Sequence, residues 1–503
     1  MSLVTEHLLT LIVFLPTVFA ILLLPFSDQD ESGRKGLKIA ALVSSLAVFA
    51  LSLLLYTGFD SAAPGFQFNE RHGWIPAFGI TYWIGIDGIS LFLILLTTFL
   101  TPIVILSSWN AIERKLKAYL ALLLVLETGM IGAFVALDVF LFYIFWEAML
   151  VPMYFLIGVW GGKERIYASM KFFLFTLVGS LLMLVAIFYL LAAHKEQFGG
   201  YSAAITDLYK LKIAFDGFLS PQTLLFLAFA ASFAIKVPMF PLHTWLPDAH
   251  VQAPTAGSVI LAGVLLKFGG YGFIRFAFPV FPAAVQYVAP AFMALGAIAI
   301  VYGAWVSMVQ PDIKKLVAYS SVSHMGFVIL GLFSLNTYAV TGSIYQMLSH
   351  GVSTGGLFLI VGMIYERRHT REIADFGGIS RAMPLFATVF MIVTLSSVAL
   401  PGTNGFIGEF LILLGSFQVS RLWTVIAGTG VIFGAVYMLW MFQRVMFGPL
   451  ANEENKALPD LSLRELAVMA PIVAAVFVMG IFPNLFLAKM EVSVRQFLTQ
   501  IKV

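Results

Sequence analysis

The stretch SFAIKVPMFPLHTWLPDAHVQAPTAGSVILAGVLLKFGGYG, residues 232–272, joins two long apolar runs and places one lysine in each of them. Lys236 is followed closely by Pro238 and Pro241, which lack amide donors and clash with the preceding helical turn, so we predict a broken helix here. Lys267 lies in an uninterrupted run. The stretch therefore predicts two membrane-spanning helices, one broken and one continuous, each carrying a cation in apolar surroundings.

The composition extends this prediction to the whole chain. Of 503 residues, 60% are apolar and 11% are charged, and the mean hydropathy is +0.95, whereas a soluble domain carries about 25% charge. Such a chain has room for a dozen or more spanning helices and for little else. It contains no cysteine, which excludes disulfides and thiolate-held metal centres. A net charge of +3 without a basic block argues against a nucleic-acid surface.

Counting apolar runs predicts an all-α polytopic membrane protein with about 14 transmembrane helices. The runs are continuous and do not alternate, which excludes a β-barrel. They fall near residues 3–26, 37–57, 84–108, 117–135, 138–159, 167–193, 221–245, 254–276, 283–308, 316–334, 338–364, 384–415, 422–447 and 466–487.

The loops predict the orientation of the chain. Most of the Lys and Arg residues lie in the loops after odd-numbered helices, so the positive-inside rule places both termini on the outer, periplasmic side. The N-terminal run lacks the basic segment of a cleaved signal, and we expect it to be retained as the first span. We expect four parts: the N-terminal helices in 1–110, a five-helix unit in 111–278, a second in 279–450, and the last helix and tail in 451–503.

A second broken helix matches the first in position. LSSVALPGTNGFIGEFLIL, residues 395–413, places Pro401 and Gly402 inside an apolar run, just before Glu409. Both breaks fall in the fourth helix of a five-helix unit, counting helices 4–8 and 9–13. Because five is odd, the second unit is predicted to be inverted relative to the first, as in inverted-repeat transporters. Proline kinks are common in membrane helices, and a chance match is the alternative.

Ionisable residues within the apolar runs are the candidate functional residues. A charge at the centre of a membrane helix costs about 2.5–3.5 kcal/mol, which implies a function or a partner. Since buried Lys, His and Glu side chains can exchange protons, we predict a proton path; ion pairs that only fix helix packing are the alternative. The residues are Glu127, Glu147, Lys236, Lys267, His324, His350 and Glu409.

Other interpretations of these residues are weaker. Two histidines could hold a haem, but no attachment motif or distal pocket accompanies them. His243, Asp248 and His250 are expected to order the turn between helices 7 and 8 rather than bind a metal. Glu127 is either a second acid or a packing contact. We expect no cofactor and no metal on this chain.

Three segments resemble a known family: FYIFWEAMLVPMYFLIGVWG (142–161) around Glu147, the opening stretch 232–272, and LSSVALPGTNGFIGEF (395–410). They are similar to the antiporter-like membrane subunits of the proton-pumping NADH:quinone oxidoreductase, respiratory complex I, and the resemblance covers most of the chain. It implies fourteen helices with two inverted five-helix repeats. It also implies a proton path whose residues are Glu147 with Lys236, then Lys267, then His324 and His350, and finally Glu409.

Within that family Glu409 indicates the M-type subunit, because the sibling subunits usually carry Lys at this place. The chain also stops soon after the fourteenth helix, whereas the L-type subunit is expected to continue into a long lateral helix. The resemblance implies that flavin, iron-sulfur clusters and quinone are bound by other subunits. The expected partners are the other membrane subunits, including the sibling antiporter-like subunits, and the lipid bilayer of a bacterial inner membrane.

The predicted function is outward proton translocation, driven by quinone reduction elsewhere in the complex and without a redox centre on this chain. A subunit of a multisubunit Na⁺/H⁺ antiporter is the first alternative, because it would use the same helices. A passive scaffold whose charges fix packing is the second. A carrier for organic solutes is least supported, since no further polar cluster indicates a substrate site.

Overall fold

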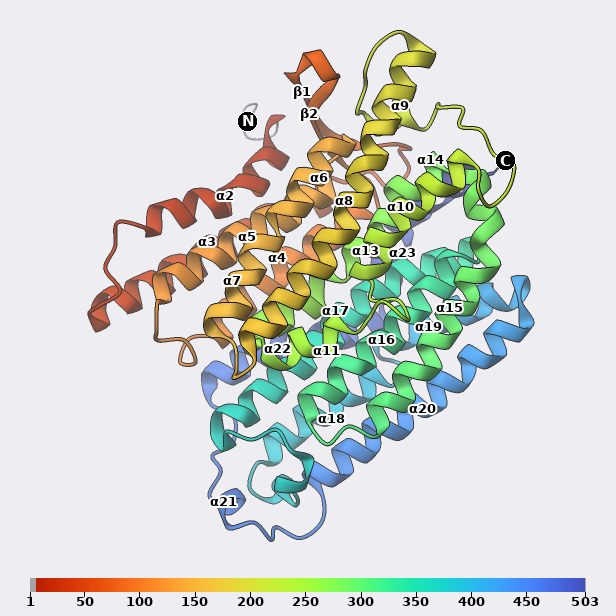
Figure 1. The fold of residues 1–503 in the computed structure, drawn as a ribbon. Helices are drawn as coiled ribbons and strands as arrows, with labels where there is room; N and C mark the ends of the chain where they lie inside the picture. Colours follow the sequence, from red (N-terminus) through yellow and green to blue (C-terminus); the bar gives the residue numbers. More distant parts are fainter. Residues whose placement is uncertain (1–5, 503) are drawn as a thin grey trace.

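The computed structural model describes residues 6–502, so the first residues of the predicted run 3–26 lie outside the described residues. Eleven helices are long and apolar enough to cross a membrane, which makes this an integral membrane protein of helical bundle type (Figure 1). They are α3 (Glu31–Gly58), α4 (Ser90–Ser107), α5 (Leu116–Val135), α6 and α7 (together Val139–Trp160), α8 (Arg165–Phe198), α12 to α14 (together Thr255–Val280), α15 (Pro282–Met308), α16 (Ile313–Leu332), α17 (Thr337–Arg368), α20 (Arg421–Met446) and α22 (Leu463–Ile481).

Four shorter apolar helices complete the bundle: α2 (Leu8–Leu23), α10 (Pro221–Lys236), α18 (Pro384–Ser397) and α19 (Asn404–Val419). α10 is followed by α11 (Trp245–Gln252), and α18 and α19 follow one another directly. If each of these pairs is counted as one crossing, the arrangement is compatible with the predicted fourteen. The start of α2 and the end of α23 (Asn484–Gln500) lie at the same end of the bundle (Figure 1).

Both predicted helix breaks are present. α10 ends at Lys236, and Pro238 and Pro241 lie in the irregular segment before α11. Pro401 and Gly402 lie in the turn between α18 and α19. Gly402 has φ +91°, a left-handed conformation that glycine adopts without steric cost. At these breaks, backbone amide and carbonyl groups inside the bundle lose their helical hydrogen-bond partners. Polar side chains or water must then satisfy them.

The continuous helix that contains Lys267 has an irregularity that the sequence did not predict. Two π-helical turns, Leu261–Leu265 and Phe273–Ala277, flank a short α-helical segment, α13 (Lys267–Gly272). A π turn adds a residue to one turn and leaves a carbonyl free of its usual partner, and such turns are frequent at functional sites. Lys267 therefore begins a segment whose backbone hydrogen bonds are partly available to side chains.

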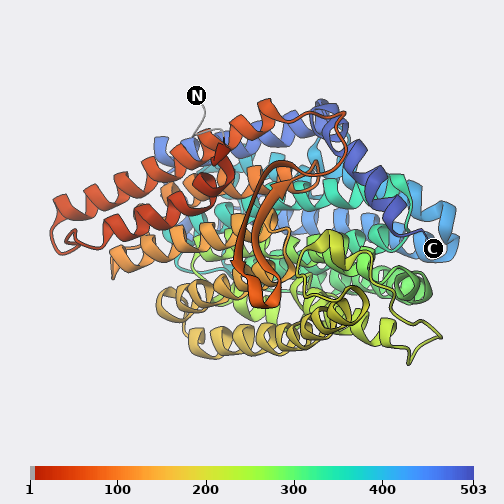
Figure 2. The same cartoon turned by 90° about the horizontal axis from the view of Figure 1, so that it is seen from above.

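A β-hairpin precedes α4 and, within residues 6–502, is the one departure from the predicted all-α fold. β1 (Gln67–Ile75) pairs antiparallel with β2 (Ile80–Ile86), and the hairpin lies across one end of the bundle (Figure 2). The prediction of a helix beginning at residue 84 was wrong, because α4 begins only at Ser90. The β-branched and aromatic residues of β2 favour a strand, and Gly79 at φ +62° supplies the turn.

Asp138 connects the hairpin to the bundle through hydrogen bonds. Its carboxylate accepts hydrogen bonds from the amide of Thr81 (2.8 Å) in β2 and from the amides of Phe140 (3.0 Å) and Leu141 (3.1 Å), which begin α6. One side chain thus caps a helix and holds a strand. We expect Asp138→Ala to lower stability by about 1–3 kcal/mol, because several buried donors lose their acceptor.

A lower melting temperature of the detergent-solubilised protein would show this effect, with faster proteolysis inside 67–86. Asp216→Ala, at an exposed position in the loop before α10, is the matched control and should melt like the parent protein. An Asp138→Ala protein that melts at the parent temperature would show that the hairpin is held by other contacts.

Candidate functional site

Lys236 ends α10 inside a pocket of aromatic rings. Its side chain is fully buried, and its Nζ atom lies 5.2 Å from the ring centroid of Trp146 and 5.5 Å from that of Phe172. Within residues 6–502 the Nζ atom has no hydrogen-bond partner. The ring faces attract an ammonium group but accept no proton. A charged Lys236 therefore depends on more distant charges or on water.

Glu147 is the predicted counter-ion of Lys236, and it lies beside Trp146 near the end of α6. The two groups make no direct contact, since neither the Nζ atom of Lys236 nor Oε1 of Glu147 has a partner in the described chain. Both groups are nevertheless close to Trp146, because Glu147 follows it directly in α6 and the Nζ atom of Lys236 lies 5.2 Å from its ring centroid. The structure therefore places the expected pair in one region as separated charges rather than as a contact ion pair.

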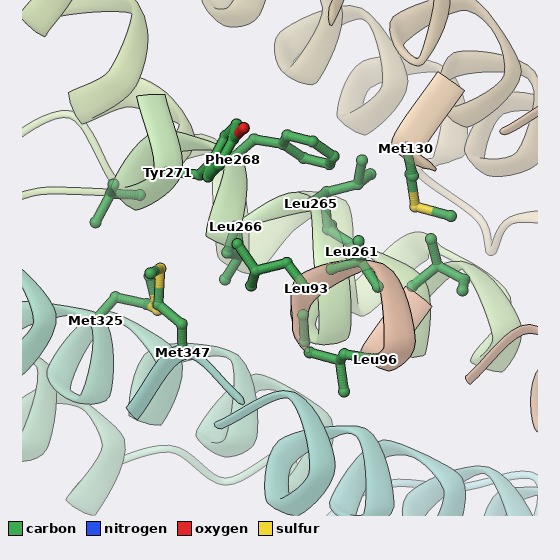
Figure 3. Packing of buried hydrophobic residues seen from close by; sticks show 14 of the residues in the cluster. Leu93, Leu96, Met130, Leu261, Leu265, Leu266, Phe268, Tyr271, Met325 and Met347 are labelled. Carbon is green, nitrogen blue, oxygen red and sulfur yellow. The ribbon is translucent and has the colours of Figure 1, made fainter. Parts of the chain in front are cut away.

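Lys267 is fully buried where helices from both halves of the chain meet. Its Nζ atom donates to the carbonyl oxygen of Ala262, in the first π turn, and to Nδ1 of His350 at 2.7 Å. A protonated lysine requires that this ring nitrogen be the acceptor. Leu266 and Met347 are among the apolar side chains that pack around this region (Figure 3). Lys267 and His350, 83 residues apart, are thus in direct hydrogen-bond contact.

His324 and Glu409 extend this row of buried ionisable side chains beyond His350. We call the row the line. The ring centroids of His350 and His324 are 5.8 Å apart, and Nδ1 of His324 lies 2.9 Å from the Glu409 carboxylate. The same carboxylate oxygen accepts a bond from Nε2 of Gln346 at 3.0 Å. The hydroxyl group of Ser397, beside the break between α18 and α19, lies 3.3 Å from Nε2 of His324.

The spatial order is therefore Lys267, His350, His324 and Glu409. A cavity of about 10 Å³ lies between the two histidines and Glu409 and is lined mainly by serine and threonine hydroxyl groups in addition to these ionisable side chains. This is about the volume that one water molecule needs, and polar walls are what hold such a water in place. No direct hydrogen bond joins the two rings in the described chain, and Nε2 of His350 has no partner there, so a single water could bridge them.

Glycines allow the helices that carry these groups to come into contact. A Cβ atom at Gly269, two residues after Lys267, would lie 2.4 Å from the carbonyl oxygen of Phe233 and 2.9 Å from the amide of Val237. At Gly408 it would lie 2.8 Å from the Cα atom of Gln346. The backbones therefore touch directly beside Lys267 and Lys236, and beside Glu409.

We expect Gly269→Ala to destabilise the protein by about 1–3 kcal/mol and to move α13 away from α10, because the new methyl group meets backbone atoms that cannot rotate away. The melting temperature in detergent measures this. Gly428→Ala in α20 is the control, since a Cβ atom there meets nothing within 4 Å. Equal melting temperatures for the two variants would contradict the close packing.

Two larger cavities open at opposite ends of α17. One, of about 610 Å³, is lined by Lys314, Arg371, Glu372 and Tyr365 among others, near the end of α17. The other, of about 800 Å³, is lined by Thr337 at the start of α17 and by Ser334, Asn336 and Arg495 among others. Lys314 is buried and donates to the carbonyl oxygen of Ala253 at 2.5 Å. Lys314 was not among the predicted residues, because it stands near the start of an apolar run and resembles a loop residue.

The remaining predicted residues do not join the line directly. Glu127 in α5 is fully buried, and its carboxylate oxygens have no hydrogen-bond partner in the part of the chain that the structure describes, so the choice between acid and packing contact stays open. Asp248 pairs with Lys171 at 2.6 Å, and His250 stacks on Phe358 with ring centroids 4.5 Å apart. Among residues 6–502, no group of three or more His, Cys, Asp or Glu could hold a metal ion.

The broken helices and the buried line of ionisable groups define an antiporter-like polytopic membrane protein. Residues 136–434 match the family model described as NADH:quinone oxidoreductase/Mrp antiporter, TM. Residues 8–133 match the model described as NADH-ubiquinone oxidoreductase chain 4, amino terminus.

Whole-chain relatives agree with these matches. NADH-quinone oxidoreductase subunit M of Rhodobacter capsulatus is 50% identical over 487 residues, covering 95% of this chain and 94% of the relative. NADH-ubiquinone oxidoreductase chain 4 of Chondrus crispus is 46% identical over 477 residues, with 95% and 94% covered. The chain belongs to the subunit M (chain 4) family of NADH:quinone oxidoreductase, the membrane subunits of an oxidoreductase, and the predicted M type is confirmed.

Solved structures give the same fold. A chain of respiratory complex I from Thermus thermophilus with bound NADH has a TM-score of 0.88 at 32% identity, with 98% of this chain and all of that chain covered. A chain of the Mrp complex from Dietzia sp. DQ12-45-1b has a TM-score of 0.84 at 19% identity over the full length of both. At that identity the second likeness shows the fold alone.

Proposed function

We propose that this chain is the proton-translocating M-type membrane subunit of an NADH:quinone oxidoreductase and that it moves H⁺ outward along its buried ionisable side chains. The observation that carries the proposal is the connected series Lys267, His350, His324 and Glu409, with direct contacts at both ends and a water-sized cavity in the middle. Helix packing alone does not require four proton-exchanging groups in a row.

The first step concerns Lys236 and Glu147. Two opposite charges about 5 Å apart attract by roughly 3 kcal/mol at an effective dielectric constant near 20. Moving one charge against 100 mV costs about 2.3 kcal/mol. Separating Glu147 from Lys236 by a movement in a neighbouring subunit would therefore cost energy of the size that translocation consumes, and it would destabilise the charged form of Lys236 so that its proton is released. Lys236 then passes its proton to Lys267, and coupling is electrostatic and conformational.

The next steps follow the spatial order of the side chains. Lys267 gives its proton to Nδ1 of His350, and a water in the 10 Å³ cavity carries it to His324. His324 passes it to the carboxylate of Glu409. Each group titrates and needs no cofactor. The chain has no cysteine, and the flavin, iron-sulfur clusters and quinone belong to other subunits in this proposal.

The two large cavities fit an inlet and an outlet. The cavity lined by Lys314 and Arg371 lies at the end that basic loops assign to the inside, and it supplies protons to Lys236. The other cavity is lined by Ser334, whose hydroxyl group lies 2.8 Å from that of Ser416 in α19, the helix that carries Glu409. Protons leave there. Both termini then lie on the outer side of a bacterial inner membrane, and the partners are the sibling antiporter-like subunits and the bilayer.

Gentle solubilisation of the membrane tests the assignment. We expect this polypeptide to migrate with flavin and with NADH:quinone reductase activity, in one complex that pumps H⁺ without sodium. If the polypeptide instead migrates without flavin and its transport depends on Na⁺, it belongs to a multisubunit antiporter. If neutral substitutions along the line weaken assembly but leave pumping intact, the charges serve only packing.

A further inference from the structure

The helix that carries Lys267 continues toward the end of the bundle where the hairpin lies, and two more polar residues follow on the same face. Tyr271 and Arg275 come four and eight residues after Lys267, which places Arg275 about 12 Å farther along the helix axis. Both are buried, and Tyr271 lies among packed apolar side chains together with Phe268 (Figure 3). The route from Lys267 to this end of the bundle therefore leads through Arg275.

Arg275 forms an ion pair with Asp87, the residue that follows the hairpin. The guanidinium NH2 group lies 2.6 Å from Oδ2 of Asp87, and both side chains are only 8% exposed. The other oxygen of Asp87 accepts from the amides of Ile89 and Ser90 at 3.0 Å each. The carboxylate thus accepts two amide hydrogen bonds at the start of α4 and also pairs with the guanidinium group. The ion pair is therefore fixed to the backbone by two hydrogen bonds.

Aromatic side chains hold the ion pair in place. The hydroxyl group of Tyr271 donates to the carbonyl oxygen of Phe134 at 2.8 Å and accepts from Nε of Arg275 at 3.3 Å. The hydroxyl group of Tyr209 donates to the carbonyl oxygen of Arg275 at 2.7 Å. The ring of Phe66 lies 4.8 Å from the guanidinium carbon.

The chemistry of this group differs from that of the line toward Glu409. A guanidinium group keeps its proton at every physiological pH, so it cannot receive a proton and pass it on. A fixed Arg also repels protons and other cations within a narrow passage. The tyrosine hydroxyl next to Lys267 already donates to a carbonyl group. Lys267 thus has a neighbour that can exchange protons, His350, on one side. On the side that faces the hairpin it has Arg275, which cannot exchange protons.

We propose that the Asp87 and Arg275 ion pair is a seal that prevents a proton on Lys267 from leaving at the hairpin end of the first five-helix unit. The inference rests on the proposed proton-carrying role of Lys267. It explains why a proton would travel sideways to His350 rather than straight out along the helix. Asp87 and Arg275 are positioning residues in this scheme, since neither carries the proton.

Passive proton leak tests the seal without any catalysis. The complex that contains this chain is reconstituted into liposomes without NADH, a potassium diffusion potential is imposed with valinomycin, and a trapped pH dye records H⁺ entry. Arg275→His places a titratable ring in the barrier, and we expect the leak to rise several-fold. Arg421→His makes the same substitution at an exposed position at the start of α20 and should leave the membrane as tight as the parent complex.

A second pair of variants separates a leak through Lys267 from a general packing defect. Adding Lys267→Ala to Arg275→His should return the leak to the parent value if protons pass through Lys267, and a persistent leak would overturn the inference. Asp87→Asn keeps an acceptor for α4 but releases the guanidinium group, and it should also leak. Parent-like tightness of both Arg275→His and Asp87→Asn in assembled complexes would equally overturn it.

The outcome is separable from that of the proposed function. If Lys236→Ala complexes still pump while Arg275→His complexes leak through Lys267, the seal stands and the pumping scheme fails. If Lys236→Ala abolishes pumping while both seal variants stay tight, the pumping scheme stands and the seal is wrong.

Discussion

Replacing Lys236 by Ala is expected to lower outward H⁺ transport by the assembled complex at least about tenfold. The side chain is buried in an aromatic pocket that includes Trp146, the residue before Glu147, and Ala can neither hold nor pass on a proton. A tenfold loss corresponds to about 1.4 kcal/mol of barrier, which is less than the attraction that the charge pair supplies. The initial rate of H⁺ uptake into inverted vesicles with NADH measures the effect.

The control is Lys212→Ala, which removes an exposed lysine before α10 and should pump like the parent. Glu147→Ala should resemble Lys236→Ala, because it removes the other member of the pair. Parent-like pumping by Lys236→Ala, in complexes shown to contain this chain, would remove Lys236 from the path.

Glu409→Gln is expected to block proton release at the far end of the line and to reduce pumping by a similar factor. The amide keeps the size of the side chain and still accepts the bonds from His324 and Gln346, so the fold is retained. It cannot take up and release a proton at neutral pH. The number of protons translocated per NADH oxidised is the quantity to measure.

Glu409→Lys restores a titratable group at the same place and should recover part of the pumping if the chemistry of the sibling subunits can be transferred. Ser416→Ala is a milder companion variant, because it removes one of the two hydroxyl groups that meet between Glu409 and the larger cavity. An unchanged proton ratio in Glu409→Gln would show that protons leave the chain before they reach Glu409.

Proline chemistry and hydropathy made most of the fold predictable. Pro238 and Pro401 interrupt their helices through local chemistry that does not depend on contacts with other helices. Both breaks could therefore be located from the sequence. The apolar runs likewise correspond to helices, eleven of them long enough within residues 6–502 to span a membrane. The predicted division into four parts and the inverted relation of the two units remain predictions.

Contacts between helices could not be predicted in the same way. The bond between Lys267 and His350 depends on the rotation of two helices and on π turns that no residue pattern signals. The same applies to Arg275 and Asp87, which are 188 positions apart. A four-residue spacing from Lys267 through Tyr271 to Arg275 was the available signal. The hairpin was hidden because its second strand is largely apolar and only three residues, 87–89, separate it from α4, so the end of the strand was counted as part of the next apolar run.

The most direct test of the account is an experimental map of this chain inside its complex, at a resolution that shows ordered water. The account predicts water between His350 and His324, and between Lys236 and Lys267, so that hydrogen bonds run without a break to Glu409. Dry, apolar packing in either gap would contradict a continuous proton path through these side chains.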